Sequence, residues 1–128
     1  MGRALRVLYV EDEPDIQEIA RMALETLGGF ELRVCCGGAE ALEVATSFGP
    51  DIVLLDVMMP GMDGIETLDG LRRLPELDAV PMVFMTAKVQ PREETALRGA
   101  GAVDVIPKPF DPLTLADEVH AIWRRHAG

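Results

Sequence analysis

Five side chains with useful chemistry stand at the ends of short apolar runs in this sequence. In chain order, Glu11 and Asp12 directly follow one run, Asp56 ends another, Thr86 ends a third and Lys108 follows a fourth. In an open parallel sheet, ligands bind beyond the carboxyl ends of the strands, so side chains at these ends gather at one edge. Randomly placed polar residues would not be sorted in this way, and the pattern predicts a common site.

Three carboxylates brought together favour a hard divalent cation. Glu11, Asp12 and Asp56 would repel one another unless a cation compensated their negative charges. Mg²⁺ (or Mn²⁺) suits oxygen ligands of this kind, usually one or two carboxylates with waters and a phosphate. Lys108 adds a point charge for a phosphate oxygen, and Thr86 adds a hydroxyl donor. A carboxylate nucleophile beside a metal and two phosphate-binding groups indicates the formation of an aspartyl phosphate.

The elements that position these residues alternate between strand and helix. Short apolar runs predict strands at Leu5–Val10, Phe30–Cys35, Ile52–Asp56, Pro81–Thr86 and Val103–Pro107. Helical spacing of apolar residues predicts helices at about Pro14–Leu27, around Ala41–Phe48, around Ile65–Leu71, near Arg92–Arg98, and from Asp111-Pro112 onward. Apolar strands alternating with helices predict an α/β fold, with a five-stranded parallel sheet covered by helices on both faces.

Length and charge limit the classes of protein that fit. The chain has 128 residues, with 12 Lys and Arg against 22 Asp and Glu, which gives a formal net charge of −10. This length fits a single domain over residues 1–128, and the acidic charge argues against nucleic acid or an anionic membrane as partner. No apolar run approaches the length of a membrane span, and the N-terminus lacks the apolar region of a signal peptide. Only 20 residues follow Lys108, so we expect one last helix and no output domain.

The two cysteines, Cys35 and Cys36, are neighbours in the chain. Adjacent cysteines are poorly placed to bridge each other, so the chain is not a disulfide framework. We interpret both as small apolar fillers at a strand end and expect a cytoplasmic location, where thiols stay reduced.

The joint pattern resembles the receiver domain of two-component response regulators over essentially the whole chain. The resemblance rests on Glu11-Asp12, on Asp56 with the loop Met59-Pro60-Gly61-Met62-Asp63-Gly64, on Thr86-Ala87 and on Lys108-Pro109-Phe110, at spacings of 44, 30 and 22 residues from Asp12 onward. The combination of these motifs is specific, whereas each motif alone would be weak. The resemblance implies a doubly wound, flavodoxin-like fold with strand order 2-1-3-4-5.

The resemblance also implies a role for each site residue. Asp56 corresponds to the phosphoacceptor, Asp12 to a direct metal ligand and Glu11 to an acid that acts on the metal through water. The backbone carbonyl of Met58 would be a further metal ligand. Thr86 corresponds to the hydroxyl that moves toward the phosphoryl group. Lys108 corresponds to the lysine that contacts it, and its peptide bond to Pro109 is typically cis in this family.

The function implied is that of a phosphorylation-dependent switch. The phosphoryl donor would be a histidine kinase or a histidine phosphotransfer protein, and the output would be binding of a downstream protein. The chain would catalyse only its own phosphorylation and dephosphorylation and would not turn over a metabolite. A dinucleotide-binding enzyme would need a glycine-rich motif after the first strand, where this chain has acids.

Three positions bear on how such a switch would behave. Receivers usually carry Tyr or Phe three residues before the lysine, where this chain has Val105. A valine has no ring that could rotate on phosphorylation, so we expect readout by backbone and loop shifts, or a weak readout. The alternative function is a non-switching protein-interaction module of receiver fold. Met58 and Lys88, two residues after Asp56 and Thr86, stand where the family tunes phosphoryl lifetime. Because Met58 cannot orient water by hydrogen bonding, we expect a long lifetime.

Several remaining residues have simpler interpretations. Glu13 is read as an acid that favours a helix N-terminus, and Gly61 and Gly64 as turn residues that need unusual backbone angles. His120 and His126 are read as solvated residues near a helix C-terminus. Trp123 is read as a packing residue.

Overall fold

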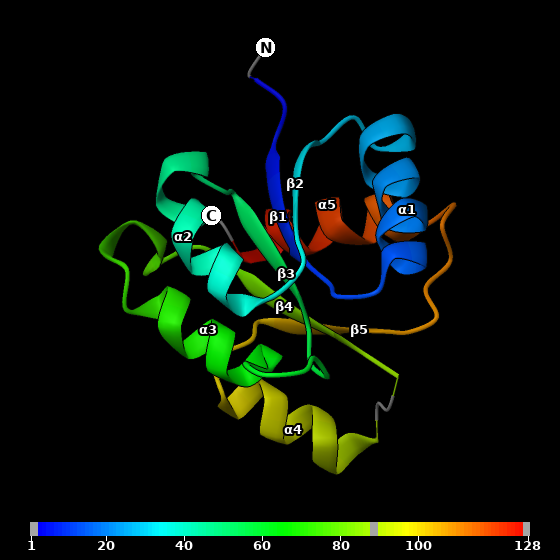
Figure 1. Cartoon of the computed structure of the whole chain (residues 1–128). Helices are drawn as coiled ribbons and strands as arrows, with labels where there is room; N and C mark the ends of the chain where they lie inside the picture. Colours follow the sequence, from blue (N-terminus) through cyan, green and yellow to red (C-terminus); the bar gives the residue numbers. More distant parts are fainter. Residues whose placement is uncertain (1–2, 88–89, 127–128) are drawn as a thin grey trace.

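The computed structural model describes residues 3–87 and 90–126, and strands alternate with helices along them (Figure 1). In chain order the elements are β1 (Arg6–Val10), α1 (Pro14–Arg21) continued by a π-helical segment η1 (Met22–Leu27), β2 (Glu31–Cys35), α2 (Gly38–Phe48), β3 (Ile52–Asp56), α3 (Gly64–Arg72), a 3₁₀ turn η2 (Pro75–Leu77), β4 (Met82–Thr86), α4 (Pro91–Gly99), β5 (Asp104–Pro107) and α5 (Leu115–His126). The predicted strands and helices are therefore present.

The strands form one parallel sheet in the order β2-β1-β3-β4-β5. This confirms the α/β class, the flavodoxin-like strand order and the helices on both faces. The register aligns the carboxyl ends of the strands: Asp56 on β3 pairs with Met85 on β4, and Thr86 on β4 pairs with Pro107 on β5. Residues at these ends are consequently brought to one edge of the sheet, as predicted.

The sheet separates two apolar cores. The side chains of Ile52 and Leu54 on β3 join α1, η1 and α5, whereas Val53 and Leu55 join the core under α2, α3 and α4. Successive strand residues point to opposite faces, so a strand covered on both sides must be apolar throughout. Burying each such side chain contributes about 1.5–3 kcal/mol, and these two cores fix the sheet whose edge carries the site.

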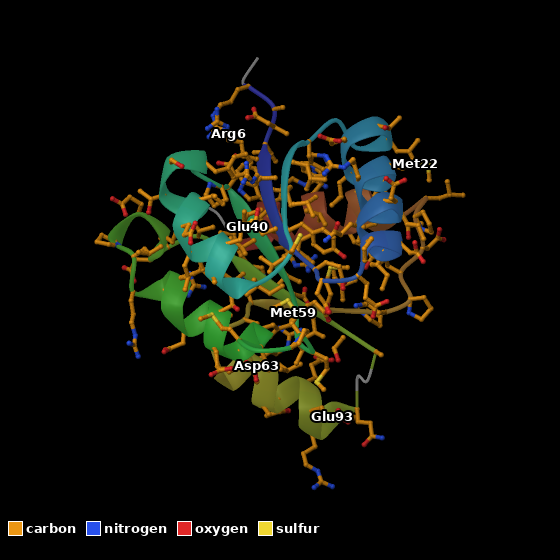
Figure 2. The ribbon with its side chains drawn as sticks, viewed as in Figure 1. Arg6, Met22, Glu40, Met59, Asp63 and Glu93 are labelled. Carbon is orange, nitrogen blue, oxygen red and sulfur yellow. The ribbon has the colours of Figure 1, made fainter. Side chains whose placement is uncertain are left out.

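The amino end of the sheet is closed by charged side chains. Asp51, just before β3, accepts hydrogen bonds from the Arg6 backbone at 2.8 Å and from the Arg3 guanidinium at 2.9 Å. Figure 2 shows Arg6 at the opposite end of the molecule from Asp63, which caps the N-terminus of α3. The structural ion pairs at this end are thus well separated from the acids at the carboxyl edge.

The last helix starts later than its sequence predicts. We expected Asp111-Pro112 to open it, but the regular helix begins at Leu115. The Asp111 carboxylate accepts the N–H of Leu113 at 2.9 Å, and its carbonyl accepts the N–H of Leu115 at 3.0 Å. Asp111 therefore caps a preceding turn, and the predicted start of the helix is wrong by one turn.

Three other interpretations have different outcomes. His120 is half-buried and stacks on the Phe30 ring at 4.3 Å, so its description as solvated is wrong. Cys35 is buried as predicted, whereas Cys36 is exposed and is not a core filler. Trp123 lies on α5 and packs against the core that this helix covers, as predicted. Among the described residues, no helix is long and apolar enough to cross a membrane.

Candidate functional site

The loop after β3 holds Asp56 by close backbone packing. A Cβ atom on Gly64 would collide with the Asp56 carbonyl oxygen and with Val57, so only glycine allows α3 to begin there. The prediction that both loop glycines adopt unusual backbone angles is confirmed for Gly61, whose φ is +75°. It is wrong for Gly64, whose φ is not positive. Asp63 and Glu66 then form a reciprocal capping box that starts α3. The loop thereby fixes the end of β3.

Three carboxylates meet at the carboxyl edge of the sheet. Glu11 is fully buried, Asp56 is 4% exposed and Asp12 is partly exposed. Each offers one carboxylate oxygen, and these oxygens lie within 4.8 Å of one another. Oxygen donors of this charge and spacing fit a hard divalent cation such as Mg²⁺. The structure thus brings together the three acids that the sequence predicted as one cluster.

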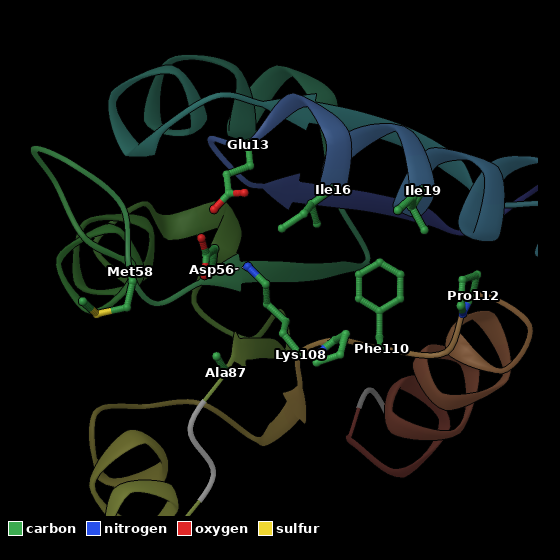
Figure 3. A pocket seen from close by; sticks show the side chains of 10 residues that line it. Glu13, Ile16, Ile19, Asp56, Met58, Ala87, Lys108, Phe110 and Pro112 are labelled. Atoms are coloured by element: carbon green, nitrogen blue, oxygen red, sulfur yellow. Dashed lines mark ion pairs between the residues drawn. The ribbon is translucent and has the colours of Figure 1, made fainter.

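Lys108 lies inside this acidic cluster. Its Nζ donates to Glu11 Oε1 at 2.9 Å and pairs with Asp56 Oδ1 at 3.3 Å. The backbone holds the lysine there, since the Lys108 N–H donates to the carbonyl of Thr86 at 2.8 Å. The Lys108–Pro109 peptide bond is cis, as the resemblance implied. Figure 3 shows the ammonium group pointing at the Asp56 carboxylate.

A second set of residues, which sequence reasoning missed, fixes Glu11. The Tyr9 hydroxyl donates to Glu11 Oε1 at 3.2 Å, and the Glu13 N–H donates to Oε2 at 3.2 Å. The Gln17 side chain donates to the Glu11 carbonyl at 2.6 Å. A signal for Tyr9 was available: residues two apart in a strand share a face, and Tyr9 precedes Glu11 by two.

Burial changes the protonation of this cluster. Desolvation raises the pKa of Asp56 to about 6, with a further contribution from the Glu11 charge, and Lys108 only partly opposes the shift. Burial tends to lower the pKa of Lys108, but its hydrogen bond to Glu11 and the two carboxylate charges outweigh that effect and raise it. Burial and the Glu11 charge also raise the pKa of Tyr9, which therefore stays a hydroxyl donor.

The raised pKa of Asp56 predicts a pH-dependent cost to folding. The native state holds the Asp56 proton more tightly than the unfolded chain, whose usual pKa is 3.8, so stability falls as pH rises from there through about 6. An Asp56→Asn variant lacks this cost. In EDTA at neutral pH, its free energy of unfolding should exceed that of the wild type by about 3 kcal/mol.

Urea unfolding across a pH series checks this expectation. The advantage of Asp56→Asn should shrink as the pH falls below about 6 and disappear only well below the usual pKa of 3.8, where Asp56 is protonated in both states. Asp69→Asn is the matched control, since Asp69 is an exposed acid paired with Arg73 on α3. An advantage that is unchanged across the pH series would contradict the assigned cause.

Two apolar cavities lie at the carboxyl edge of the sheet, and Asp56 lines the larger one. The larger, of about 480 Å³, lies between α1 and the β5–α5 loop, with Ile16 and Ile19 facing Phe110 (Figure 3). The smaller, of about 370 Å³, lies beside α4 and reaches Thr86. Met58 lines both cavities and is 79% exposed. The phosphoacceptor candidate Asp56 therefore borders the apolar surface of the larger cavity.

The remaining predicted residues are placed as follows. Thr86 ends β4 and is 8% exposed, on the edge that carries the acids. Val105 on β5 is half-buried and packs against the core beneath α4. Glu13 is exposed immediately before α1. Lys88 lies outside the described residues.

Comparison with known proteins agrees with this geometry. The chain matches the family "Response regulator receiver domain" over residues 7–120. It is 37% identical to the transcriptional regulatory protein CseB of Streptomyces coelicolor, over 100% of this chain and 54% of that protein. It is 38% identical to the DNA-binding response regulator MtrA of Mycolicibacterium smegmatis, over 94% of this chain and 51% of that protein.

Solved structures show the same fold. The chemotaxis protein CheY4 of Vibrio cholerae superposes with a TM-score of 0.87 at 28% identity, covering 93% of this chain and 98% of that one. A response regulator from Chloroflexus aurantiacus gives a TM-score of 0.86 at 31% identity, covering 95% of this chain and 99% of that one.

The fold and the acidic edge of the sheet define a receiver domain of two-component signalling. The chain belongs to the response regulator receiver domain family. It spans about half the length of the curated relatives that it matches.

Proposed function

We propose that Asp56 accepts a phosphoryl group with the help of Mg²⁺ (or Mn²⁺) and that Lys108 and Thr86 hold the phosphoryl oxygens. The observation that supports this most strongly is the contact of the Lys108 ammonium with both Glu11 and Asp56 beside a cluster of three carboxylates. Such a cluster has a nucleophile, a place for a hard cation and a positive group for a phosphate oxygen.

The proposed reaction transfers a phosphoryl group from a histidine nitrogen of the donor to a carboxylate oxygen of Asp56. An Asp56 carboxylate oxygen attacks the phosphorus of a phosphohistidine, the new O–P bond forms, and the P–N bond breaks with its electron pair left on the imidazole. Asp12 and Asp56 would bind the cation directly, with Glu11 acting through water and the carbonyl of Met58 as a further ligand. When bound, Mg²⁺ offsets the negative charge of the phosphoryl oxygens and of the acids around them.

The chain's own residues carry the rest of the mechanism. Lys108 is held at the site by its backbone, so its ammonium needs only a small movement to reach a phosphoryl group on Asp56. Thr86 ends the neighbouring strand and offers its hydroxyl on the same edge. Movement of Thr86 toward the phosphoryl group would alter the surface near α4, which lies beside the smaller cavity.

The proposed donor is a histidine kinase or a histidine phosphotransfer protein, and the output is binding to a downstream protein. We propose a cytoplasmic location, no contact of this chain with nucleic acid or membrane, and no turnover of a separate metabolite. The net charge of −10 supports the absence of nucleic-acid binding by this chain. The joint placement of the acids and Lys108 favours this switch over a non-switching interaction module.

The direct test is incubation of the chain with acetyl phosphate, with Mg²⁺ or with EDTA, followed by intact-mass measurement and peptide mapping. We expect the mass gain of one phosphoryl group, dependent on Mg²⁺ and located on the Asp56 peptide. Profiling against a panel of histidine kinases then identifies the physiological donor. No uptake, uptake equal in EDTA, or uptake mapped to another residue would refute the proposal.

The exposed Met58 predicts slow loss of the phosphoryl group. A thioether is a poor hydrogen-bond partner, so Met58 cannot orient a water toward the phosphorus two residues away. After removal of acetyl phosphate, we expect the phosphorylated chain to persist for minutes or longer, and a Met58→Asn variant to lose the group several-fold faster. Intact mass against time measures both rates. Loss from the wild type within seconds would contradict this expectation.

A further inference from the structure

Two hydrogen-bond donors share a single oxygen of Glu11. Lys108 Nζ lies 2.9 Å from Glu11 Oε1, and the Tyr9 hydroxyl lies 3.2 Å from the same atom. The other carboxylate oxygen, Oε2, accepts the Glu13 N–H at 3.2 Å. Glu11 is fully buried, so these groups take the place of solvent around its charge.

The shared oxygen matters because Lys108 has a second partner. The same ammonium lies 3.3 Å from Asp56 Oδ1, which is the proposed point of phosphoryl attachment. When Lys108 turns to a phosphoryl group, it must weaken its bond to Glu11. A buried carboxylate left without a donor is costly, so the movement is unfavourable unless another donor stays on Oε1.

We propose that Tyr9 is a positioning residue that keeps Glu11 Oε1 hydrogen-bonded and so frees Lys108 for the phosphoryl group on Asp56. This inference rests on the proposed function of Asp56. Tyr9 suits the task because β1 is an interior strand that pairs with both β2 and β3, so the backbone of Tyr9 is held between Val34 and Leu54. The hydroxyl is held in place by the fold and cannot follow Lys108.

The plain structural role of Tyr9 is core packing, since its ring is fully buried among α1, η1 and α5. A Tyr9→Phe variant keeps the ring and removes only the hydroxyl. With Mg²⁺ and acetyl phosphate, we expect this variant to take up the phosphoryl group about tenfold more slowly, the factor for one hydrogen bond to a charged group.

Thr67→Val is the matched control. Thr67 is also fully buried, and its hydroxyl donates to the Asp63 carbonyl at 2.8 Å, outside the carboxylate cluster. This variant loses a buried hydroxyl of similar kind and should keep the wild-type rate of uptake. A similar slowing in Thr67→Val would overturn the specific role given to Tyr9.

The Lys108→Ala background separates positioning from stability. If Tyr9 acts by freeing Lys108, Tyr9→Phe should have no further effect on the uptake rate once Lys108 is absent. The effect of Tyr9→Phe on the midpoint of urea unfolding in EDTA should instead grow when Lys108 is absent. Tyr9→Phe should lower it more in the Lys108→Ala background than in the wild type, because Oε1 then loses its last side-chain donor.

Each result decides the question. Loss of the rate effect together with a larger midpoint shift in the double variant would support the proposal. An equal factor in both backgrounds, or no slowing in Tyr9→Phe, would overturn it. Absence of phosphoryl uptake by the wild type would instead refute the proposed function. The urea midpoints of the single and double variants would still test whether Tyr9 and Lys108 share Glu11 Oε1. Lys108→Met, which keeps the volume of the side-chain stem, replaces Lys108→Ala if the double variant does not fold.

Discussion

An Asp56→Asn variant is expected to take up no phosphoryl group from acetyl phosphate or from any histidine phosphodonor. The amide lacks the charged oxygen that attacks phosphorus, and no other carboxylate of the cluster has the same surroundings. Glu11 is fully buried with both oxygens hydrogen-bonded, and Asp12 is not paired with Lys108 in the structure. Intact mass and radiolabel incorporation measure the loss, which should be at least about a thousandfold.

The controls for this variant distinguish lost chemistry from lost structure. Asp69→Asn removes an exposed acid on α3 and should be phosphorylated at the wild-type rate. Asp56→Asn should also remain folded, since it removes one charge from a cluster that has an excess of carboxylates. Uptake by Asp56→Asn near the wild-type rate would contradict the assignment of Asp56 as the phosphoacceptor.

A Lys108→Ala variant is expected to lose both stability and rate of phosphoryl uptake. The Lys108 side chain is 14% exposed, and its ammonium contacts both Glu11 and Asp56. Removing it leaves two buried carboxylates without that partner, which typically costs about 3 kcal/mol of unfolding free energy in EDTA. Uptake of the phosphoryl group should slow by about a hundredfold, because the Lys108 ammonium no longer stabilises the oxygens of the phosphoryl group during transfer.

Magnesium should restore much of the lost stability but little of the lost rate. A cation among the carboxylates would offset the charge that Lys108 no longer balances, but it would not replace the contact of the Lys108 ammonium with the phosphoryl oxygens. Urea unfolding with and without Mg²⁺, beside phosphorylation kinetics, measures both quantities. Arg73→Ala is the control, because its ion pair with Asp69 is exposed and should contribute under about 1 kcal/mol. An equally small effect of Lys108→Ala would contradict the buried pairing.

The structure also bears on how much a sequence reveals about a receiver domain. The strand order agrees with what the resemblance to the family implied. The gathering of Glu11, Asp12, Asp56 and Thr86 at one edge was expected from the sequence pattern itself and is confirmed. This success has a physical cause. Apolar strands separated by helices must run parallel, and parallel strands place all their carboxyl ends on one side.

Other features could not be read from spacing. Gly64 is required because of its closeness to the Asp56 backbone, a contact that depends on how the loop closes after β3. His120 is half-buried because α5 passes close enough to the segment between η1 and β2 for its ring to stack on Phe30. Both contacts depend on how neighbouring elements pack, which a pattern along one element does not describe.

The sequence by itself determined the class of fold, the edge of the sheet that carries the candidate site and the acidic side chains that gather there. It did so because apolar periodicity fixes the strands, and the strands fix where their ends lie. Only the tertiary structure decided which donor meets which oxygen: Lys108, 97 positions from Glu11 in the chain, shares Oε1 with Tyr9 while also reaching Asp56. Such pairings follow from side-chain direction and burial within the folded cluster, where each charge must find a partner because water is excluded.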